Sequence, residues 1–425
     1  MSQDANRSVA QPVEPLVHRD RAKAAMQRAS LDALFGCEDA NLYYLSGHAP
    51  DSVLCHFYDE WAVAILPCHE VPACLVTSEY DIAYVATHRT WMPEVRFYGA
   101  EWSSASGLMK KIHAGEGVDT DLRPHLRELY DQTRSLRSSG LLDAVAAYIE
   151  QHLPRGEIRL GFDDVRLGHM VAQRVGDRCT IVDARWIFRE IRVVKTEAEI
   201  AMLRHAARVN EQALAAAGNN IQSGGRWSNM VDAFRESLTS HSAKPAGERG
   251  MLFGAGPDGS FVLDHDYVAG KRFARGDAVV LDAISIWRLY YADMARTATV
   301  GEPTARQSSI FKAVQEVLED AEQLLHTGVH TRSIEEHAAR MLTAKGLEPR
   351  LATLVFHPIG LNVFDYGTRD AVTGGWVVES ETVLNFEVFY RDPEAGGLHL
   401  EDSVCVRGNR IERLSTLPRD LVIVQ

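Results

Sequence analysis

The sequence predicts a protein of the α/β (α+β) class with two domains. Short apolar runs alternate with helical patterns over the first 185 residues, and helices are interleaved with acid-containing, strand-like runs in the second half. A helix-start signature just after residue 190 separates the two regions. The chain has 425 residues, a length that suggests about three units but also suits two large ones.

The first region alternates strands and helices along the chain. Apolar runs at 62–66 and 73–76 are typical of strands, and a further strand is expected near 158–162. A helix is expected over 140–151, just before that third run. We therefore expect residues 1–190 to form an α/β domain.

The second region begins with a helix whose start is marked by a capping box. Thr196 and Glu199 have the spacing at which each side chain accepts a hydrogen bond from the backbone N–H of the other. The Ala- and Leu-rich stretch that follows ends at Gly218, a usual helix stop. Ser333 and Glu336 indicate a second capping box. Residues 191–425 are expected to form the second domain, with helices at about 196–217, 227–239, 304–326 and 333–345.

Composition excludes several classes of protein. A hydrophobic content of 46% supports a sizeable core, and no apolar run approaches the roughly 20 residues of a membrane span. The polar N-terminal stretch lacks the apolar centre of a signal peptide. A net charge of −13 argues against a nucleic-acid partner, and the six cysteines show no paired metal spacing. We expect a cytoplasmic protein with reduced thiols and no membrane partner.

Four carboxylates and one imidazole in the second region form a candidate ligand set for two divalent metal ions. They are Asp282, Asp293, His357, Glu387 and Glu401. Each acid lies in an apolar, strand-like run, where a buried carboxylate is costly unless it is paired or bound to metal. The brief connection between the runs that contain Asp282 and Asp293 indicates a hairpin, which can aim both carboxylates at one point. Any one of these acids alone would more simply be a surface or ion-paired group, but together they favour Mn, Fe, Co or Zn.

The order and spacing of these residues resemble the pita-bread metalloenzymes, which include methionine aminopeptidases, prolidases, Xaa-Pro aminopeptidases and creatinase. The family pattern is Asp, ten residues, Asp, two residues and then Arg-Thr, and it is matched by Asp282, Asp293, Arg296 and Thr297. His357 is similar to the metal histidine that opens a His-Gly-x-Gly segment in many members.

The resemblance continues on both sides of this pattern. Glu387 and Glu401 match the two metal glutamates of the family, the latter in a Glu-Asp pair with Asp402. Residues 41–47 resemble part of the smaller domain of prolidases and creatinase, and residues 192–199 resemble their domain junction. A creatinase/prolidase-like N-terminal domain followed by a pita-bread catalytic domain is therefore implied.

The resemblance also implies roles and partners. Glu387 is expected to be both a metal ligand and the proton shuttle, and His265 is expected to stabilise or protonate the substrate from the side. A water held between two divalent ions would attack the substrate carbonyl. A homodimer is expected, because the small domain of the family usually helps to close the neighbour's site.

Three departures from the family lie around this ligand set. Phe364 stands where proline-specific members carry a second histidine, although the acid after it, Asp365, is kept. His399 replaces an arginine two residues before the last glutamate, and Pro358 replaces a glycine after the metal histidine. We expect Phe364, His399 and Tyr366 to bind substrate. The departures indicate either ordinary drift or an altered substrate.

Three functions are compatible with the sequence. The first is metal-dependent hydrolysis of an amide-type C–N bond in a short, Xaa-Pro-like peptide or a related small molecule. The second is action on a small metabolite, as in the dimethylsulfoniopropionate C–S lyases that resemble this family, with Asp365 as catalytic base and Trp287, Tyr290, Tyr366 or Trp376 facing a cationic group. The third is a non-catalytic binding protein, against which the intact ligand set argues. We favour the hydrolase, with the C–S lyase as the alternative.

Overall fold

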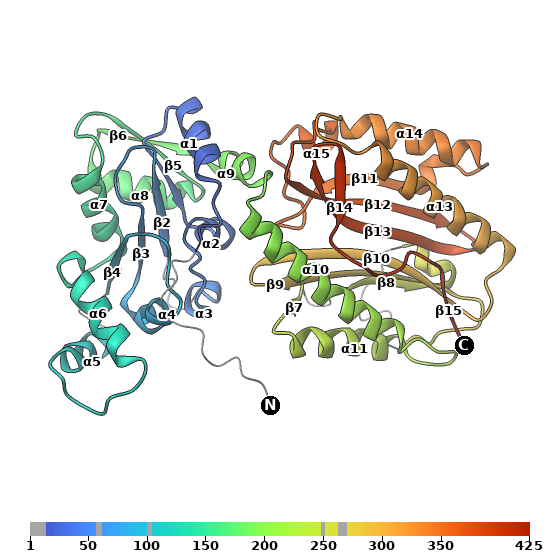
Figure 1. Ribbon diagram of the computed structural model, residues 1–425, viewed down its shortest axis with the longest axis horizontal. Coiled ribbons are helices and arrows are strands. Elements are labelled where there is room, and N and C mark those ends of the chain that lie inside the picture. Colours follow the sequence, from blue (N-terminus) through green and yellow to red (C-terminus); the bar gives the residue numbers. More distant parts are fainter. Residues whose placement is uncertain (1–13, 57–61, 100–103, 248–250, 262–269) are drawn as a thin grey trace. The chain divides into compact units, whose positions relative to one another are not determined.

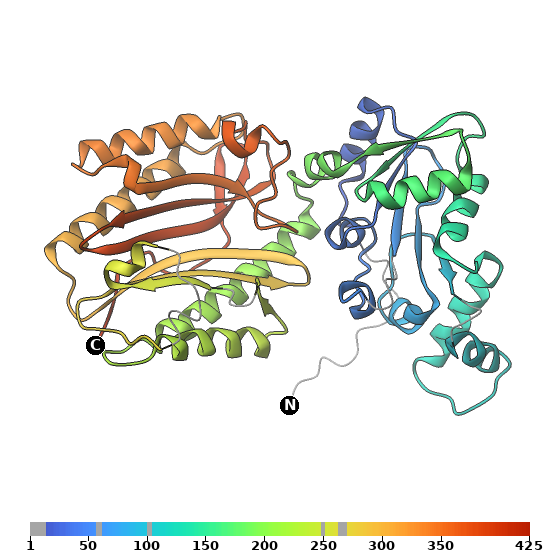
Figure 2. The ribbon, with the colours of Figure 1, turned by 180° about the vertical axis from the view of Figure 1, so that it is seen from behind.

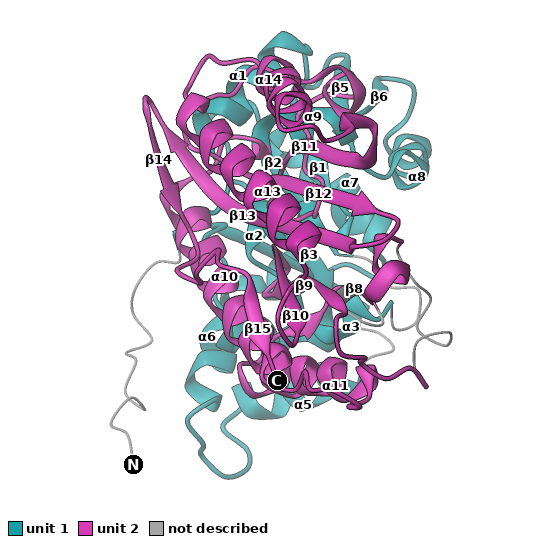
Figure 3. Cartoon of the chain, turned by 90° about the vertical axis from the view of Figure 1, so that its right-hand side faces the viewer, with its two compact units in different colours: residues 1–191 teal, residues 192–425 magenta. Residues whose placement is uncertain are grey.

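The computed structural model describes most of the chain, as two compact units. The described residues are 14–56, 62–99, 104–247, 251–261 and 270–425. The units are Met1–Ile191 and Arg192–Gln425 (Figure 3). His265 lies outside the described residues. No helix among the described residues is long and apolar enough to cross a membrane.

The first unit contains a mixed six-stranded sheet. Its strands are β1 (Ala33–Gly36), β2 (Val63–Pro67), β3 (Cys74–Ser78), β4 (Glu94–Tyr98), β5 (Ile158–Phe162) and β6 (Cys179–Asp183). They lie in the order β4-β3-β2-β1-β5-β6, and the β1/β2 and β2/β3 pairs are antiparallel while the others are parallel. The three strands expected in this region are confirmed as β2, β3 and β5.

Short helices accompany this sheet (Figure 1). They are α1 (Arg19–Arg28), α2 (Asp39–Ser46), α3 (Asp51–Leu54), α4 (Ile82–Thr87), α5 (Ser104–His113), α6 (Arg123–Thr133), α7 (Leu141–His152), α8 (Val165–Val175) and α9 (Arg185–Arg192). Apolar side chains of α7 and α8, such as Ile149 and Val171, share one core with Phe35 and Phe162 of the sheet. The predicted helix over 140–151 is α7.

The second unit contains a nine-stranded sheet. Its strands are β7 (Lys244–Pro245), β8 (Met251–Ala255), β9 (Ala278–Trp287), β10 (Tyr290–Val300), β11 (Ala352–Pro358), β12 (Thr382–Asp392), β13 (Gly396–Arg407), β14 (Arg410–Arg413) and β15 (Val422–Val424). The main path runs β11-β12-β13-β10-β9-β7, with β8 paired to β9, β14 to β13 and β15 to β10. All these pairs are antiparallel except β10/β15.

Helices cover one face of this sheet in two groups. They are α10 (Glu197–Gly218), α11 (Trp227–Ser240), α13 (Ala305–Leu324), α14 (Thr331–Ala344) and the short α15 (Ala371–Gly374). Apolar side chains of α10 and α11 pack on β9 and β10, and those of α13 and α14 pack on β11, β12 and β13. In the view of Figure 2, α13 and α14 (orange) lie above the strands of this unit, and α10 and α11 (green) lie below them. The strand faces turned away from the helices are therefore free to carry polar groups.

The helix starts agree with the sequence in one case and differ in the other. The capping box of Thr196 and Glu199 is present, with both hydrogen bonds made. The box expected at Ser333 is wrong, because α14 already begins at Thr331, and the Ser333 hydroxyl donates to the carbonyl of His330 instead. A serine inside the first turn can donate back to a carbonyl three residues earlier, which uses up its capping potential.

Candidate metal centre

Five neighbouring strands of the second unit each contribute one of the predicted ligands. Across the sheet they are His357 on β11, Glu387 on β12, Glu401 on β13, Asp293 on β10 and Asp282 on β9. The strands are adjacent in space although three of them come more than 50 residues after the other two in the chain. The fold, and not sequence proximity, therefore assembles the set.

Strand register places the ligands of β9, β10 and β13 on one face. Ala295 of β10 is the cross-strand partner of both Asp282 and Glu401. Directly paired residues share a face, and residues two apart along a strand do so as well. Asp293, two residues before Ala295, therefore points to the same side as Asp282 and Glu401.

The same reasoning extends to β11 and β12. Glu387 is paired directly with Glu401, and it is also the partner of Val355 on β11. His357 lies two residues after Val355, so its ring is on the face of the glutamates. All five side chains thus meet on the face opposite the helices.

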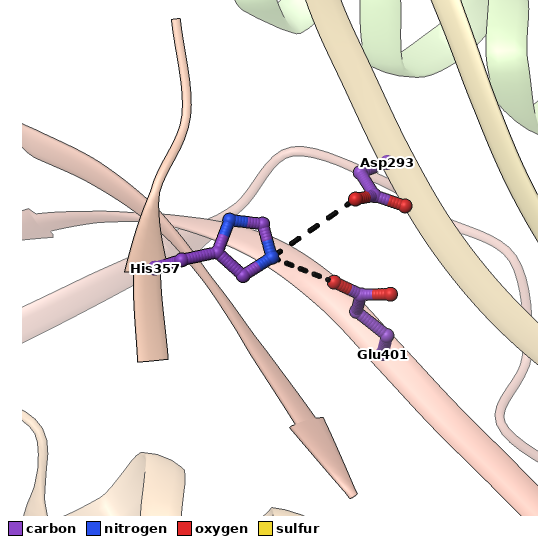
Figure 4. A group of neighbouring side chains, drawn as sticks. All are labelled: Asp293, His357 and Glu401. Atoms are coloured by element: carbon purple, nitrogen blue, oxygen red, sulfur yellow. Dashed lines mark hydrogen bonds and ion pairs between the residues drawn. The ribbon is translucent and has the colours of Figure 1, made fainter. Parts of the chain in front are cut away.

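Four of these side chains, together with His399, form two overlapping groups, and Asp282 belongs to neither. Ligand atoms of Asp293, His357 and Glu401 lie within 4.8 Å of one another, and so do those of Glu387, His399 and Glu401. In the first group His357 Nε2 is 3.2 Å from Glu401 Oε1 and 4.0 Å from Asp293 Oδ2 (Figure 4). Glu401 belongs to both groups, as a ligand shared by two ions would.

Burial makes this concentration of acids costly without a cation. Burial raises the pKa of Asp282 to about 7. The nearby His399 lowers this pKa, and the charges of Glu401 and Glu387 raise it further. Burial, and then the Glu401 and Asp282 charges, raises the pKa of Asp293 well above its usual range. The Oδ1 atoms of both aspartates have no hydrogen-bond partner among the described residues. Oxygen donors of this kind, with one imidazole, fit a divalent transition metal or zinc.

Neighbouring groups orient the ligands. His357 Nδ1 lies 2.9 Å from the carbonyl oxygen of Val363, so it carries the hydrogen and leaves the Nε2 lone pair facing the acids. Asn385 donates from Nδ2 to Glu401 Oε1 at 2.8 Å. Asn385 is not among the residues predicted from sequence, although its position two residues before Glu387 in a strand places it on the same face.

The Arg-Thr pair after Asp293 braces the neighbouring strand β13. Arg296 is buried and donates to the carbonyl of Glu401 at 2.9 Å and to Asp402 Oδ1 at 2.8 Å. The Thr297 hydroxyl accepts from the backbone N–H of His399 at 2.8 Å and donates to its carbonyl at 2.9 Å. These contacts fix the backbone on both sides of Leu400.

A small pocket opens onto this cluster. It has a volume of about 220 Å³. Its walls include Val280, Ile284, Val363, Phe364 and Phe389, and its floor is formed by the five predicted ligands. Arg391 is the one arginine or lysine among the described residues that line it, and its guanidinium lies 3.9 Å from the centre of the Phe389 ring. The sequence analysis also missed Arg391.

The other predicted site residues lie in different environments. Phe364 lines the pocket and is 50% exposed. Tyr366 is buried and donates from its hydroxyl to the carbonyl of Phe356, outside the pocket lining. Asp365 is fully buried, accepts from Arg192 Nη2 at 2.6 Å and lies 3.6 Å from Lys195 Nζ. In this arrangement Asp365 is paired with two cations, and its expected role as a base stays a prediction. His399 lies beside the acids.

Comparison with known proteins agrees with this geometry. The model of metallopeptidase family M24 matches residues 201–408, and that of the Creatinase/Prolidase N-terminal domain matches residues 18–194. The chain belongs to the pita-bread metallopeptidase family, and it is a metallohydrolase. Members of this family use divalent metals.

Two relatives and two solved structures illustrate the similarity. The chain is 23% identical over 398 residues to an Xaa-Pro dipeptidase of Pyrococcus horikoshii, covering 93% of this chain and 96% of the relative. It is 25% identical over 237 residues to an Xaa-Pro dipeptidase of Pyrococcus furiosus, covering 56% and 67%. The P. horikoshii prolidase structure matches with a TM-score of 0.68 at 20% identity, over 95% of this chain and 99% of that one. An Xaa-Pro dipeptidase structure from Bacillus anthracis matches with a TM-score of 0.70 at 17% identity, over 96% and 99%.

Proposed function

We propose that this protein hydrolyses the amide bond of a short, Xaa-Pro-like peptide with water activated by two divalent metal ions. The observation that carries the proposal is the single face on which five adjacent strands bring together four carboxylates and an imidazole. A relative that aligns with 93% of this chain is named as an Xaa-Pro dipeptidase. When bound, the ions would polarise the substrate carbonyl and lower the pKa of a water molecule.

The residues of the two groups divide the work of holding the ions. Asp293, His357 and Glu401 would hold one ion, and Glu401 with Glu387 would hold the other, with Asp282 beside them. Glu387 has the most exposed side chain of the four acids, at 20%, against 13% for Asp282 and less for the other two. It is therefore the ligand best placed to take a proton from water and pass it to a leaving amine in the pocket.

The shape and charge of the pocket favour a small substrate with a carboxylate. Its volume of about 220 Å³ is below the roughly 300–1,000 Å³ of pockets for drug-sized ligands. The guanidinium of Arg391 lines the pocket, where it can donate hydrogen bonds to the carboxylate of a dipeptide. The apolar walls suit a side chain or a proline ring.

The C–S lyase alternative needs a carboxylate base close to the metal centre. Asp365 is engaged by Arg192 and Lys195, and it does not line the pocket. No observation on the described residues favours the lyase over peptide hydrolysis.

Turnover by purified, metal-stripped protein reloaded with Mn, Fe, Co or Zn tests the proposal. The substrates are Xaa-Pro dipeptides, matched dipeptides without proline, and dimethylsulfoniopropionate. We expect metal-dependent cleavage of the Xaa-Pro dipeptides, and we expect Asp293→Ala to lower kcat/KM by about 10³-fold, which corresponds to about 4 kcal/mol. Asp320→Ala, at a half-exposed acid on α13 that pairs with His337, is the matched control.

Two outcomes of this experiment would contradict peptide hydrolysis by the metal centre. Cleavage that persists in Asp293→Ala, or that needs no metal, contradicts the proposal. Turnover of dimethylsulfoniopropionate without peptide cleavage would replace the hydrolase by the lyase.

A further inference from the structure

His399 is a buried imidazole to which the proposed function assigns no role. It lies on β13 two residues before Glu401, and therefore on the face that carries the predicted ligands. Its side chain is 1% exposed, and neither ring nitrogen has a hydrogen-bond partner among the described residues. Burying a polar atom without a hydrogen-bond partner costs free energy and is rare in native proteins. A bound ion would give a ring nitrogen of His399 the partner that it lacks.

Carboxylates surround the His399 ring at distances too long for good hydrogen bonds but suitable for a shared cation. Nε2 is 3.3 Å from Glu387 Oε2 and 4.0 Å from Glu401 Oε2, and Nδ1 is 3.9 Å from Asp282 Oδ2. The ligand atoms of Glu387, His399 and Glu401 all lie within 4.8 Å of one another. This is a three-ligand group in its own right.

The ring is held firmly in this position. Thr297 makes two hydrogen bonds with the His399 backbone. The ring stacks on Phe389, its cross-strand partner, at a centroid distance of 4.6 Å and an interplanar angle of 16°. A ligand fixed by packing and backbone contacts loses little freedom on binding an ion.

We propose that His399 is a sixth side-chain ligand of the metal centre, binding through Nε2 the ion that Glu387 and Glu401 hold. This inference rests on the metal centre of the proposed function. Asp282 Oδ2 lies 3.9 Å from Nδ1, too far for a hydrogen bond, so the ring position depends on Phe389 and Thr297. Each ion then has one histidine, His357 for one and His399 for the other. An added imidazole favours zinc over manganese, because imidazole is a good ligand for zinc while manganese prefers oxygen ligands.

The competing role for His399 is that of an imidazolium counter-ion. The family pattern has arginine at this position, and a protonated histidine would supply the same charge to the acid cluster without binding metal. Arginine keeps a positive charge but offers no lone pair, whereas glutamine is neutral. His399→Arg therefore tests ligation separately from charge, and His399→Gln removes both.

X-ray absorption of zinc-loaded protein counts imidazole ligands directly and needs no turnover. Two histidines shared by two ions give about one imidazole per zinc, and one histidine gives about half. We expect the higher count in the wild type and the lower count in both His399→Arg and His399→Gln. We also expect the preference for zinc over manganese, measured by competition and elemental analysis, to fall about tenfold in both variants. His337→Gln, at a half-exposed histidine on α14, is the control and should match the wild type.

Each result has one meaning. A wild type that binds two zinc ions with about half an imidazole per ion overturns the role of His399 and leaves the proposed function standing. A His399→Arg protein with wild-type imidazole count and metal preference also overturns it, in favour of the counter-ion. A wild type that binds no metal overturns the proposed function and this inference together. The wild-type count decides the question even if a variant does not fold.

Discussion

The Phe364 ring lies at the mouth of the pocket, 4.5 Å between centroids from the ring of His357. The ring is half exposed, so a substrate in the pocket can touch it. Phenylalanine can pack against a proline ring but cannot donate a hydrogen bond to a peptide carbonyl. The proline-specific members that the sequence resembles carry a histidine at this position.

Phe364→His should therefore raise kcat/KM for Xaa-Pro dipeptides. We expect an increase of about tenfold, which is one added hydrogen bond to a developing charge. Steady-state kinetics on a series of Xaa-Pro dipeptides measure the change. Phe364→Leu, which keeps an apolar side chain without a ring nitrogen, is the control, and its kcat/KM for Xaa-Pro dipeptides should not rise. An unchanged rate in Phe364→His would mean that the pocket does not present its substrate as proline peptidases do.

At the scale of residues, spacing predicted a ligand set because acids in apolar strands stand out against their neighbours. Asp365 and Tyr366 follow Phe364 directly, yet only Phe364 reaches the pocket. The sequence could not show which of the three side chains faces the pocket, because side chains alternate regularly between two faces only within a strand and not in the loop that follows it. Asn385 and Arg391 were missed for a related reason: polar residues in a strand resemble surface residues until the face is known.

At the scale of elements, the β9–β10 hairpin was predictable from two apolar runs with a brief connection. Ten residue pairs join the strands, and they are connected by the two-residue turn Arg288–Leu289. Both turn residues have positive φ, at 46° and 66°, a conformation that Asn and Gly prefer in such turns. Their residue types gave no signal of it. The tight turn keeps Asp282 and Asp293 on one face.

The loop after β11 is fastened by Asp365. Its backbone N–H donates to the carbonyl of Pro358 at 2.8 Å, and its carboxylate binds Arg192 and lies beside Lys195, which precede α10. Gly360 makes this approach possible, since a Cβ there would lie 2.8 Å from both Asp365 Oδ2 and Lys195 Nζ. The loop that follows His357 is thereby joined to the first helix of the unit.

Asp365→Asn should destabilise the fold, because it leaves two buried cations without their counter-charge. We expect a loss of about 3–5 kcal/mol in the free energy of unfolding, measured by urea denaturation. Asp320→Asn, at an exposed ion pair, should change that free energy by less than about 0.5 kcal/mol. Unchanged stability together with lost turnover would instead assign Asp365 the role of a catalytic base.

At the scale of the whole molecule, the two-unit α/β organisation followed from the alternation of patterns and the helix start near residue 190. The strand order of the larger sheet did not. β10 pairs with β13 about 100 residues later, and β15 pairs with β10 from the end of the chain. Local periodicity contains no information on such distant partners, so the sequence could suggest candidate ligands but not the sheet face on which they meet.

One buried group in each unit has a pKa shift that changes stability with pH, and the two changes have opposite signs. In the first unit, burial lowers the pKa of His48 to about 3, with His88 nearby adding to the shift. In the second, burial raises the pKa of Glu199 to about 7. The Glu199 contribution is fully present below pH 4.5 and is lost as the pH rises through 7. The His48 contribution is fully present above pH 6.5 and is lost as the pH falls toward 3. In a measurement of global stability the contributions of Glu199 and His48 would partly cancel each other.

Local hydrogen exchange can isolate the contribution of His48. The imidazole is buried, lies 3.1 Å from the Thr77 hydroxyl and meets Tyr84 edge-on, so its protonated form is poorly accommodated. Between pH 7 and pH 4.5 we expect amides of β1 and β2 to lose about 3 kcal/mol of protection, after correction for intrinsic exchange rates. His48→Gln keeps a polar partner for Thr77 and has no proton to gain, so most of that loss should disappear. His69→Gln, at an exposed histidine of the same unit, should behave as the wild type. An equal loss in His48→Gln and the wild type would place the acid sensitivity of this unit elsewhere.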